Sequence, residues 1–251
     1  MVARVDYSGR IAGSYRAGRR LPPEAVSSWT DAVARHLGPA GGAILDLGSG
    51  TGRFSSALAT RFGVPVVALE PADGMREQAP PAGSRGGVAM AAGRGEAVPA
   101  RDGAFVAVWA SQVLHHVDDL PRCVAELRRV VRLGGPVMVR GTFEATGALV
   151  PWARYFPEAA HIATELFPTL EEITAAFDAV GMQPRAHDVI WQTTAGSMGE
   201  LAARVGLRAD STLELLNDDA FAAGMARLEA AAAAETSPVP VREALELVVF
   251  V

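Results

Sequence analysis

The sequence predicts an α/β fold in which a mostly parallel sheet is covered by helices on both faces. Strand-like and helical segments alternate through the first 143 of the 251 residues. The strand segments are apolar at nearly every position, which is typical of parallel strands buried on both faces. With 49% hydrophobic residues the chain can bury a sizeable core, and its length fits one large domain or two small ones.

Each element of this fold follows from a local pattern of apolar residues and breakers. In the first half we expect strands at 42–48, 65–71, 105–111 and 135–143, and helices at 54–63 and 121–135. In the second half we expect an irregular stretch at 144–168, a helix at 169–181, a strand at 184–194, two helical segments at about 196–234 and a last strand at 243–251.

Two of these later elements carry a specific signal. Thr169 and Glu172 have the spacing of a capping box, and Gly181 supplies a stop, so the helix between them is well defined. No helix follows the last strand, and a helical insertion separates it from the strand before. We therefore expect the last strand to lie antiparallel among parallel neighbours.

Composition excludes several classes of protein. The single cysteine, Cys123, rules out an internal disulfide, a thiolate zinc site and an iron–sulfur cluster, and it is expected to be a small buried residue. The chain contains no lysine, which excludes a pyridoxal phosphate Schiff base and a Walker A loop. A net charge of −5 argues against nucleic acid as a partner. No apolar run is long enough for a membrane span, so a cytoplasmic location is expected.

The segment ILDLGSGTGR, residues 44–53, places three glycines at every second position after Asp46. Between a strand and a helix, such a series exposes backbone amides where small polar ligands bind. A dinucleotide fingerprint requires a third glycine where this chain has Arg53, which weakens nicotinamide and flavin as ligands. Glu70 ends the next strand, where a carboxylate can accept both hydroxyls of a ribose. The pattern therefore favours a nucleoside that has no pyrophosphate.

Here the chain resembles the class I S-adenosylmethionine-dependent methyltransferases, in particular the small-molecule branch with the ubiquinone and menaquinone methyltransferases. Five segments occur in the family's order: LDLGSGTGR, VVALEPADGM, GEAVP, FVAVWASQVLHHV and ELRRVVRLGG. The resemblance implies a Rossmann-like, doubly wound sheet of seven strands. It also implies one methyltransferase domain, with lid helices at 1–40, a cofactor-binding core at 41–143, substrate cap elements at 144–175 and 194–238, and the final strand.

The resemblance assigns residues to S-adenosylmethionine, whose product is S-adenosylhomocysteine. Asp46 would meet the ammonium group, the backbone from Gly48 through Ser49 and Gly50 to Gly52 would meet the amino-acid end, and Glu70 would hold the ribose. The remaining assignments are Met75 against an adenine face, the backbone of Gly95 and Glu96 at the adenine edge, Ser111 near the methionine moiety, and Tyr15 and Arg19 in a lid over the cofactor carboxylate.

Two positions depart from the family pattern. Arg94 stands where an acidic residue often occurs, which weakens a side-chain bond to the adenine amine. Val106 stands where an aspartate is common, which argues against a catalytic divalent metal, and no metal site is expected.

Methyl transfer from a sulfonium is an in-line displacement, so positioning supplies most of the catalysis. His115 and His116 lie beside the expected cofactor site, and a histidine can take a proton at neutral pH. The alternative is that this pair only packs at a strand-to-helix turn. Asp118 and Asp119 are interpreted as helix caps.

The expected partner is a small-molecule acceptor, methylated at O, N or C, in specialised metabolism. Aromatic residues of the irregular stretch, including Trp152, Phe156 and His161, are either pocket wall or core. Arg204, Arg208 and Asp210 are interpreted as a solvated face, with contact to a polar substrate as the alternative. A second function stays open: a protein that keeps the cofactor as a scaffold and catalyses a rearrangement, or only binds. An α/β hydrolase is excluded because the chain has no G-x-S-x-G elbow.

Overall fold

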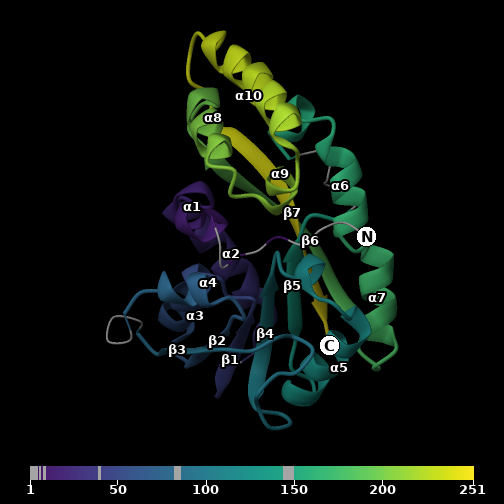
Figure 1. Ribbon diagram of the computed structural model, residues 1–251. Helices are drawn as coiled ribbons and strands as arrows, with labels where there is room; N and C mark the ends of the chain where they lie inside the picture. Colours follow the sequence, from purple (N-terminus) through teal and green to yellow (C-terminus); the bar gives the residue numbers. More distant parts are fainter. Residues whose placement is uncertain (1–4, 6, 8–9, 39–40, 82–85, 144–149) are drawn as a thin grey trace.

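The computed structural model describes residues 5, 7, 10–38, 41–81, 86–143 and 150–251 (Figure 1). Within these residues seven strands form one sheet in the order β3-β2-β1-β4-β5-β7-β6. The strands are β1 Ala43–Leu47, β2 Val66–Leu69, β3 Val88–Ala91, β4 Phe105–Ser111, β5 Val137–Gly141, β6 Pro184–Ala195 and β7 Val241–Phe250. The predicted doubly wound, Rossmann-like α/β fold is confirmed.

The last strand lies where the sequence predicted it. The pairs β3–β2, β2–β1, β1–β4 and β4–β5 are all parallel. Strand β7 runs antiparallel to both of its neighbours, β5 and β6, with Val137 opposite Phe250 in one pair and Pro184 opposite Phe250 in the other. The final strand is therefore inserted between two strands that precede it in the chain.

Helices cover both faces of the sheet. Trp29 and Val33 of α2 (Pro23–His36) and Phe54 and Leu58 of α3 (Arg53–Phe62) pack on one face. The other face is covered by α5 (Leu120–Val130) and α7 (Leu170–Asp178), which pack against each other. The short helix α4 (Asp73–Glu77) follows β2.

The local signals identified in the sequence are present. The Thr169 side chain accepts from the Glu172 backbone N–H, and the Glu172 carboxylate accepts from the Thr169 N–H, so both halves of the capping box are formed. Asp119 caps α5 by accepting from the Arg122 N–H at 3.0 Å. The Cys123 side chain is fully buried.

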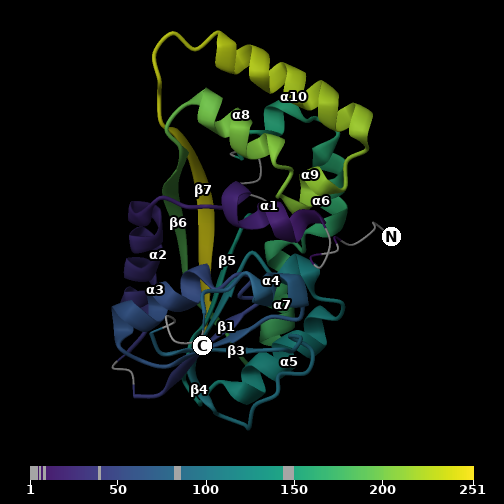
Figure 2. The same cartoon turned by 60° about the vertical axis from the view of Figure 1, so that its left-hand side comes forward.

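A cap of helices stands over the carboxyl edge of the sheet, where β6 and β7 extend upward (Figures 1 and 2). It consists of α6 (Ala159–Leu166), α8 (Met198–Gly206), α9 (Ser211–Glu214) and α10 (Asp218–Ala233). These helices share a small apolar core around Phe156 and Leu228. Helix α1 (Arg10–Gly18) lies between this cap and α4, in contact with α8 and α4.

Three expectations about single elements were wrong. The stretch 144–168 is not irregular throughout, because it contains a 3₁₀ turn, Ala153–Tyr155, and α6. The segment 196–234 holds three helices instead of two within the part described. Strand β3 was missed because it has only four residues, VAMA, at a half-exposed sheet edge, too few to form an apolar run. Residues 1–4, 6, 8–9 and 144–149 of the predicted lid and cap lie outside the described residues.

No helix that the structure describes is both long enough and apolar enough to cross a membrane.

Candidate functional site

The loop after β1 depends on glycine for its backbone conformation. Gly48, Gly50 and Gly52 have φ values of +61°, +57° and +78°, in the region that side chains disfavour. A Cβ on Gly48 would lie 2.1 Å from Val113 Cγ2, so this glycine serves packing. A Cβ on Gly50 would lie 3.3 Å from Met75 Cε and 3.8 Å from Tyr15 Cε1. Gly50 thus lies close to two residues that the resemblance assigns to the cofactor.

Asp46 lies on β1 directly below this loop. Its side chain is buried, and its Oδ2 accepts from the Ser55 hydroxyl at 2.5 Å. Burial raises the pKa of Asp46 to about 7, although the hydrogen bond from Ser55 acts in the opposite direction. The carboxyl group therefore changes charge near neutral pH, and a cationic ligand beside it would favour the ionised form.

Glu70 joins the end of β2 to the glycine loop. One carboxylate oxygen accepts from the Gly50 N–H and the other from the Ala72 N–H, both at 2.9 Å. Burial raises the pKa of Glu70, and these backbone bonds oppose that shift. Each carboxylate oxygen has two lone pairs, so each keeps the capacity to accept a further hydrogen bond.

The loop also contains a buried polar atom to which no described residue forms a hydrogen bond. The Ser49 hydroxyl oxygen is buried and has no hydrogen-bond partner among the described residues. Buried polar groups are nearly always paired, so such an atom indicates a missing ligand or water. It fits the polar end of a nucleoside cofactor.

The residues assigned to the adenine lie close to this loop, and two of them, Gly95 and Glu96, also stabilise the local structure. Met75 of α4 is buried. A Cβ on Gly95 would lie 2.7 Å from Cys123 Sγ, so only glycine fits there. The Glu96 carboxylate accepts from the Asp118 N–H at 2.6 Å. The Glu96 carbonyl accepts from Arg122 Nε at 3.0 Å, so both the side chain and the carbonyl of Glu96 stabilise this loop.

Both departures from the family pattern have structural consequences. The Arg94 guanidinium pairs with Asp118, and its Nε lies 3.8 Å from a Glu96 carboxylate oxygen. Val106 is buried in the core. Among the residues whose placement is described, no group of three or more His, Cys, Asp or Glu side chains is arranged to hold a metal ion.

A cavity of about 550 Å³ lies between the glycine loop, α1 and the cap. Tyr15, Arg19, His115 and His116 all line it. Apolar side chains form another part of its wall, among them Trp152. The two other aromatic candidates are elsewhere: Phe156 is fully buried in the core of the cap, and the His161 side chain is 82% exposed.

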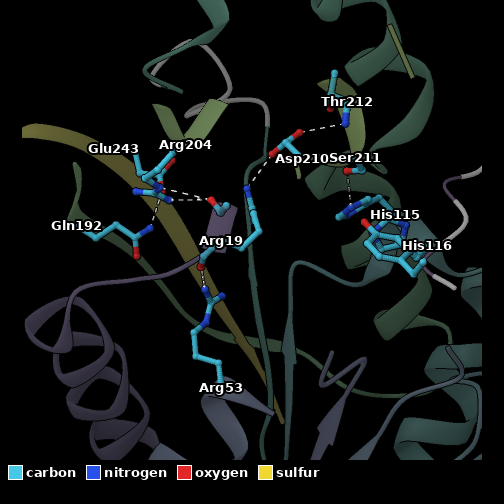
Figure 3. Close-up of polar contacts among 12 residues, drawn as sticks. Arg19, Arg53, His115, His116, Gln192, Arg204, Asp210, Ser211, Thr212 and Glu243 are labelled. Atoms are coloured by element: carbon cyan, nitrogen blue, oxygen red, sulfur yellow. Dashed lines mark hydrogen bonds and ion pairs between the residues drawn. The ribbon is translucent and has the colours of Figure 1, made fainter. Parts of the chain in front are cut away.

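The lid residue Arg19 is bound to the cap. Its Nη1 lies 2.8 Å from Asp210 Oδ2 at the N-terminus of α9 (Figure 3). Burial alone would lower the pKa of Arg19, but the neighbouring Asp210 carboxylate raises it overall. This pair closes α1 against the cap on one side of the cavity.

The interpretation of Arg204, Arg208 and Asp210 as a solvated face is wrong. Arg208 is buried, and its Nη1 donates to Asp218 at 2.6 Å. Arg204 and Asp210 line the cavity. Sequence reasoning misplaced them because the helical insertion folds down over the sheet edge, and that tertiary contact has no local signal.

The two histidines follow β4 in a 3₁₀ turn, Leu114–His116. His115 stacks on Phe167 with ring centroids 4.2 Å apart, and its Nε2 lies 3.4 Å from the Ser211 hydroxyl. Burial lowers the pKa of His115 well below its ordinary value, and the charges of His116 and Arg19 add to the shift. His115 is therefore neutral at pH 7.

His116 has a phenol partner from the start of the chain. Its Nε2 lies 3.0 Å from the Tyr7 hydroxyl oxygen, and the two rings meet edge to face. Burial raises the pKa of Tyr7, so the phenol stays protonated, and the tautomer of His116 sets which of the two groups donates. Tyr7 was not among the predicted site residues, although it lies in the predicted lid at 1–40, eight residues before Tyr15.

Several other cavity residues were also missed. Arg140 is a charged residue at the end of the otherwise apolar strand β5, and this break in the pattern was a usable signal. Gln112, between β4 and the histidines, has a φ of +53°, which is strained for a non-glycine residue and typical of functional turns. Arg53, Gln192 and Glu243 complete the polar wall.

Comparisons with known proteins agree with this geometry. Residues 45–139 match the family model described as a methyltransferase domain. An uncharacterized methyltransferase of Mycobacterium tuberculosis is 36% identical over 132 residues, 51% of this chain and 48% of that protein. A demethylmenaquinone methyltransferase of Thermobifida fusca is 40% identical over 99 residues, 38% of this chain and 42% of that protein. The chain spans about half the length of the curated relatives it matches.

A solved structure, the [4+2]-cyclase SpnF, has the same fold over 93% of this chain and 84% of its own, with a TM-score of 0.62 and 22% identity. The sheet order and the glycine loop fit the matched methyltransferase domain. Over residues 45–139 the chain is therefore similar to the class I S-adenosylmethionine-dependent methyltransferases.

Proposed function

We propose that this chain binds S-adenosylmethionine at the glycine loop and transfers its methyl group to a small molecule held in the cavity. One observation carries the proposal: the loop and the cavity share a wall. Tyr15 lies 3.8 Å from the position of a Gly50 Cβ and also lines the cavity. Arg53 directly follows Gly52 and lines it too. A ligand on the loop therefore has one end at the cavity.

The residues that would hold the cofactor are those around the loop. Asp46 would meet the ammonium group, and Glu70 would accept from the ribose hydroxyls. The hydroxyl of Ser49 would supply a polar contact for the amino-acid end, and Met75 an apolar surface for the base. When bound, S-adenosylmethionine supplies an electrophilic methyl group on a sulfonium.

The protein's own part is to orient an acceptor and, where the acceptor is a hydroxyl or an acidic carbon, to take a proton. His115 is neutral and lies in the cavity wall, so it can accept a proton, although its lowered pKa makes it a weak base. The Tyr7–His116 pair offers a second route. A role in specialised metabolism and a cytoplasmic location stay predictions from the sequence.

A second candidate function is a rearrangement that leaves the sulfonium intact. The fold shared with the [4+2]-cyclase SpnF and the weak basicity of His115 support keeping it. Product analysis separates the two. Methyl transfer yields S-adenosylhomocysteine in step with methylated acceptor, whereas a rearrangement consumes no S-adenosylmethionine.

The first experiment is a calorimetric titration of the protein with S-adenosylmethionine, S-adenosylhomocysteine and NAD. We expect the first two to bind and NAD not to bind. Glu70→Ala should weaken the binding of S-adenosylmethionine by about 1–3 kcal/mol, because charged hydrogen bonds are lost. Glu229→Ala, a change at an exposed residue of α10, serves as the matched control. Binding of NAD, or unchanged affinity in Glu70→Ala, would contradict the proposal.

A further inference from the structure

The wall of the cavity is unusually rich in positive charge. Four arginines line it, Arg19, Arg53, Arg140 and Arg204, against two carboxylates, Asp210 and Glu243. Asp210 is paired with Arg19. The Glu243 carboxylate accepts from Gln192 Nε2 at 2.5 Å, and its negative charge acts on Arg204 (Figure 3). Positive charge therefore exceeds negative charge around the cavity.

Arg140 is the most buried of these arginines, with 3% of its surface exposed. Its Nη1 donates to the Ser111 hydroxyl at 3.1 Å, its Nη2 donates to Gln192 Oε1 at 3.2 Å, and its guanidinium lies 4.4 Å from the Trp29 ring centroid. Its Nε is buried and has no hydrogen-bond partner among the described residues. The guanidinium is thus fixed in place by neutral groups and retains an unused donor.

Arg204 and Arg53 repeat this arrangement. Arg204 donates from Nε and Nη2 to the Gly18 carbonyl at 3.4 and 3.3 Å, and its buried Nη1 has no partner within the described part of the chain. Arg53 donates from Nη1 to the Arg19 carbonyl, and its buried Nε is likewise without a partner there. Among the residues that the structure places, no carboxylate lies within ion-pair distance of Arg53, Arg140 or Arg204.

This arrangement is unfavourable for the folded protein alone. Burial lowers the pKa of Arg140 to about 9, and the charges of Arg53 and Arg19 contribute to the shift. Burial also lowers the pKa of Arg53 to about 10. A buried charge without a partner is costly, and like charges near one another add to the cost. Such clusters of perturbed groups occur where a ligand supplies the opposite charge.

We propose that the acceptor carries an oxyanion, a carboxylate or a phosphate, which Arg140 and Arg204 bind with the help of Arg53. Guanidinium groups recognise both anions through paired N–H donors, and three such groups retain donors at this wall. The part of the wall that includes Trp152 and Phe167 is apolar, so the body of the acceptor is apolar. This inference rests on the proposed function, because it names the substrate class of the same cavity.

The competing use of these arginines is to bind the carboxylate of the cofactor. Arg53 is next to the glycine loop and is the member of the cluster nearest to it in sequence. Arg140 and Arg204 come instead from β5 and α8. Substitution of these two residues therefore tests the acceptor site, and parallel titration with S-adenosylmethionine reports on the cofactor site.

The experiment uses three probes: 3-phenylpropanoate, phenyl phosphate and the neutral 3-phenylpropanamide. Each is titrated by calorimetry into the protein with and without S-adenosylhomocysteine. The variants are Arg204→Gln and Arg140→Gln, with Arg185→Gln at an exposed position of β6 as the matched control. Circular dichroism checks the fold of Arg140→Gln, and Arg204→Gln, at a half-buried position, carries the test if the buried substitution unfolds the protein.

At least one anionic probe should bind about tenfold more tightly than the amide, and either variant should lose at least about tenfold of that affinity while Arg185→Gln does not. The tighter of the two anions identifies the carboxylate or the phosphate. Equal binding of anion and amide, no binding of either anion, or an unchanged affinity in Arg204→Gln would overturn the proposal. So would an equal loss of affinity for S-adenosylmethionine in both variants, since it would assign the cluster to the cofactor.

The two proposals fail in different ways. Binding of S-adenosylmethionine without binding of an anionic probe removes the acceptor class and leaves the methyltransferase function. Binding of an anionic probe without S-adenosylmethionine removes that function and leaves an oxyanion site.

Discussion

The glycine loop and the cavity wall lie side by side at the carboxyl edge of the sheet. They differ in whether their charged side chains have hydrogen-bond partners among the described residues. In the loop, Glu70 accepts two backbone N–H groups and Asp46 accepts a hydroxyl. In the cavity wall, Arg53, Arg140 and Arg204 each retain a buried donor without a partner. The loop is organised before any ligand arrives, whereas the wall is completed by the charge that a ligand brings.

The largest effect on stability should come from a substitution in the glycine loop, Gly48→Ala. In Gly48→Ala the new Cβ would lie 2.1 Å from Val113 Cγ2, at a φ of +61°. The left-handed conformation and the overpacking together should lower the free energy of unfolding by about 2–5 kcal/mol. Urea denaturation measures it. Gly13→Ala, in α1 with open space around the glycine, is the control and should not destabilise the protein.

If Gly48→Ala were as stable as the control, the loop would be adaptable, and the contrast with the cavity wall would be lost.

The next effect is a pH dependence of cofactor affinity, caused by the titration of Asp46 below the glycine loop. Asp46 has a folded pKa of about 7 against an ordinary value of 3.8. Because folding raises this pKa, the contribution of Asp46 to stability is full below pH 3.8 and is lost as the pH rises through 7. The ammonium group of the cofactor requires the ionised form. Affinity for S-adenosylmethionine should therefore increase about tenfold between pH 5.5 and 7, up to one decade per pH unit.

Calorimetry at the two pH values checks this expectation. Asp46→Asn should bind weakly and lose the pH dependence, while Asp31→Asn, at an exposed carboxylate, should keep it. A wild-type affinity that does not change with pH would show that Asp46 does not meet the ammonium group.

The smallest effect should come from releasing Arg19 from its ion pair in the cavity wall. Asp210→Asn removes this pair, in which the side chains of Arg19 and Asp210 are 29% and 19% exposed. The amide oxygen of the new side chain can still accept from the Thr212 N–H as a helix cap. The loss of stability should be about 1 kcal/mol or less, since the pair is partly exposed. The freed guanidinium should tighten the binding of phenyl phosphate several-fold. A weaker binding of that probe would mean that Arg19 does not reach the anion.

The sequence identified the residues of the glycine loop and four residues that line the cavity, but it missed the arginines Arg53, Arg140 and Arg204 as a group, for a physical reason. Asp46, Gly50 and Glu70 lie within two strand–loop units, so strand pattern and glycine spacing place them without knowledge of the tertiary fold. Arg53, Arg140 and Arg204 belong to α3, β5 and α8, and only the sheet order and the folding of the cap bring them together. No periodicity links residues so far apart. The roles assigned to the cofactor residues stay predictions until ligand binding is measured.

The insertion of β7 between β5 and β6 has a consequence for the order of assembly. The cavity wall takes Arg140 from β5, Gln192 from β6 and Glu243 from β7, and β6 reaches the rest of the sheet only through β7. The pairing of Val137 with Phe250 closes a loop of more than a hundred residues, which makes it a late step in folding. The five parallel strands and the glycine loop can form before this step. During synthesis, we therefore expect the glycine loop to be completed first, and the cavity beside it to form only after the last strand has docked.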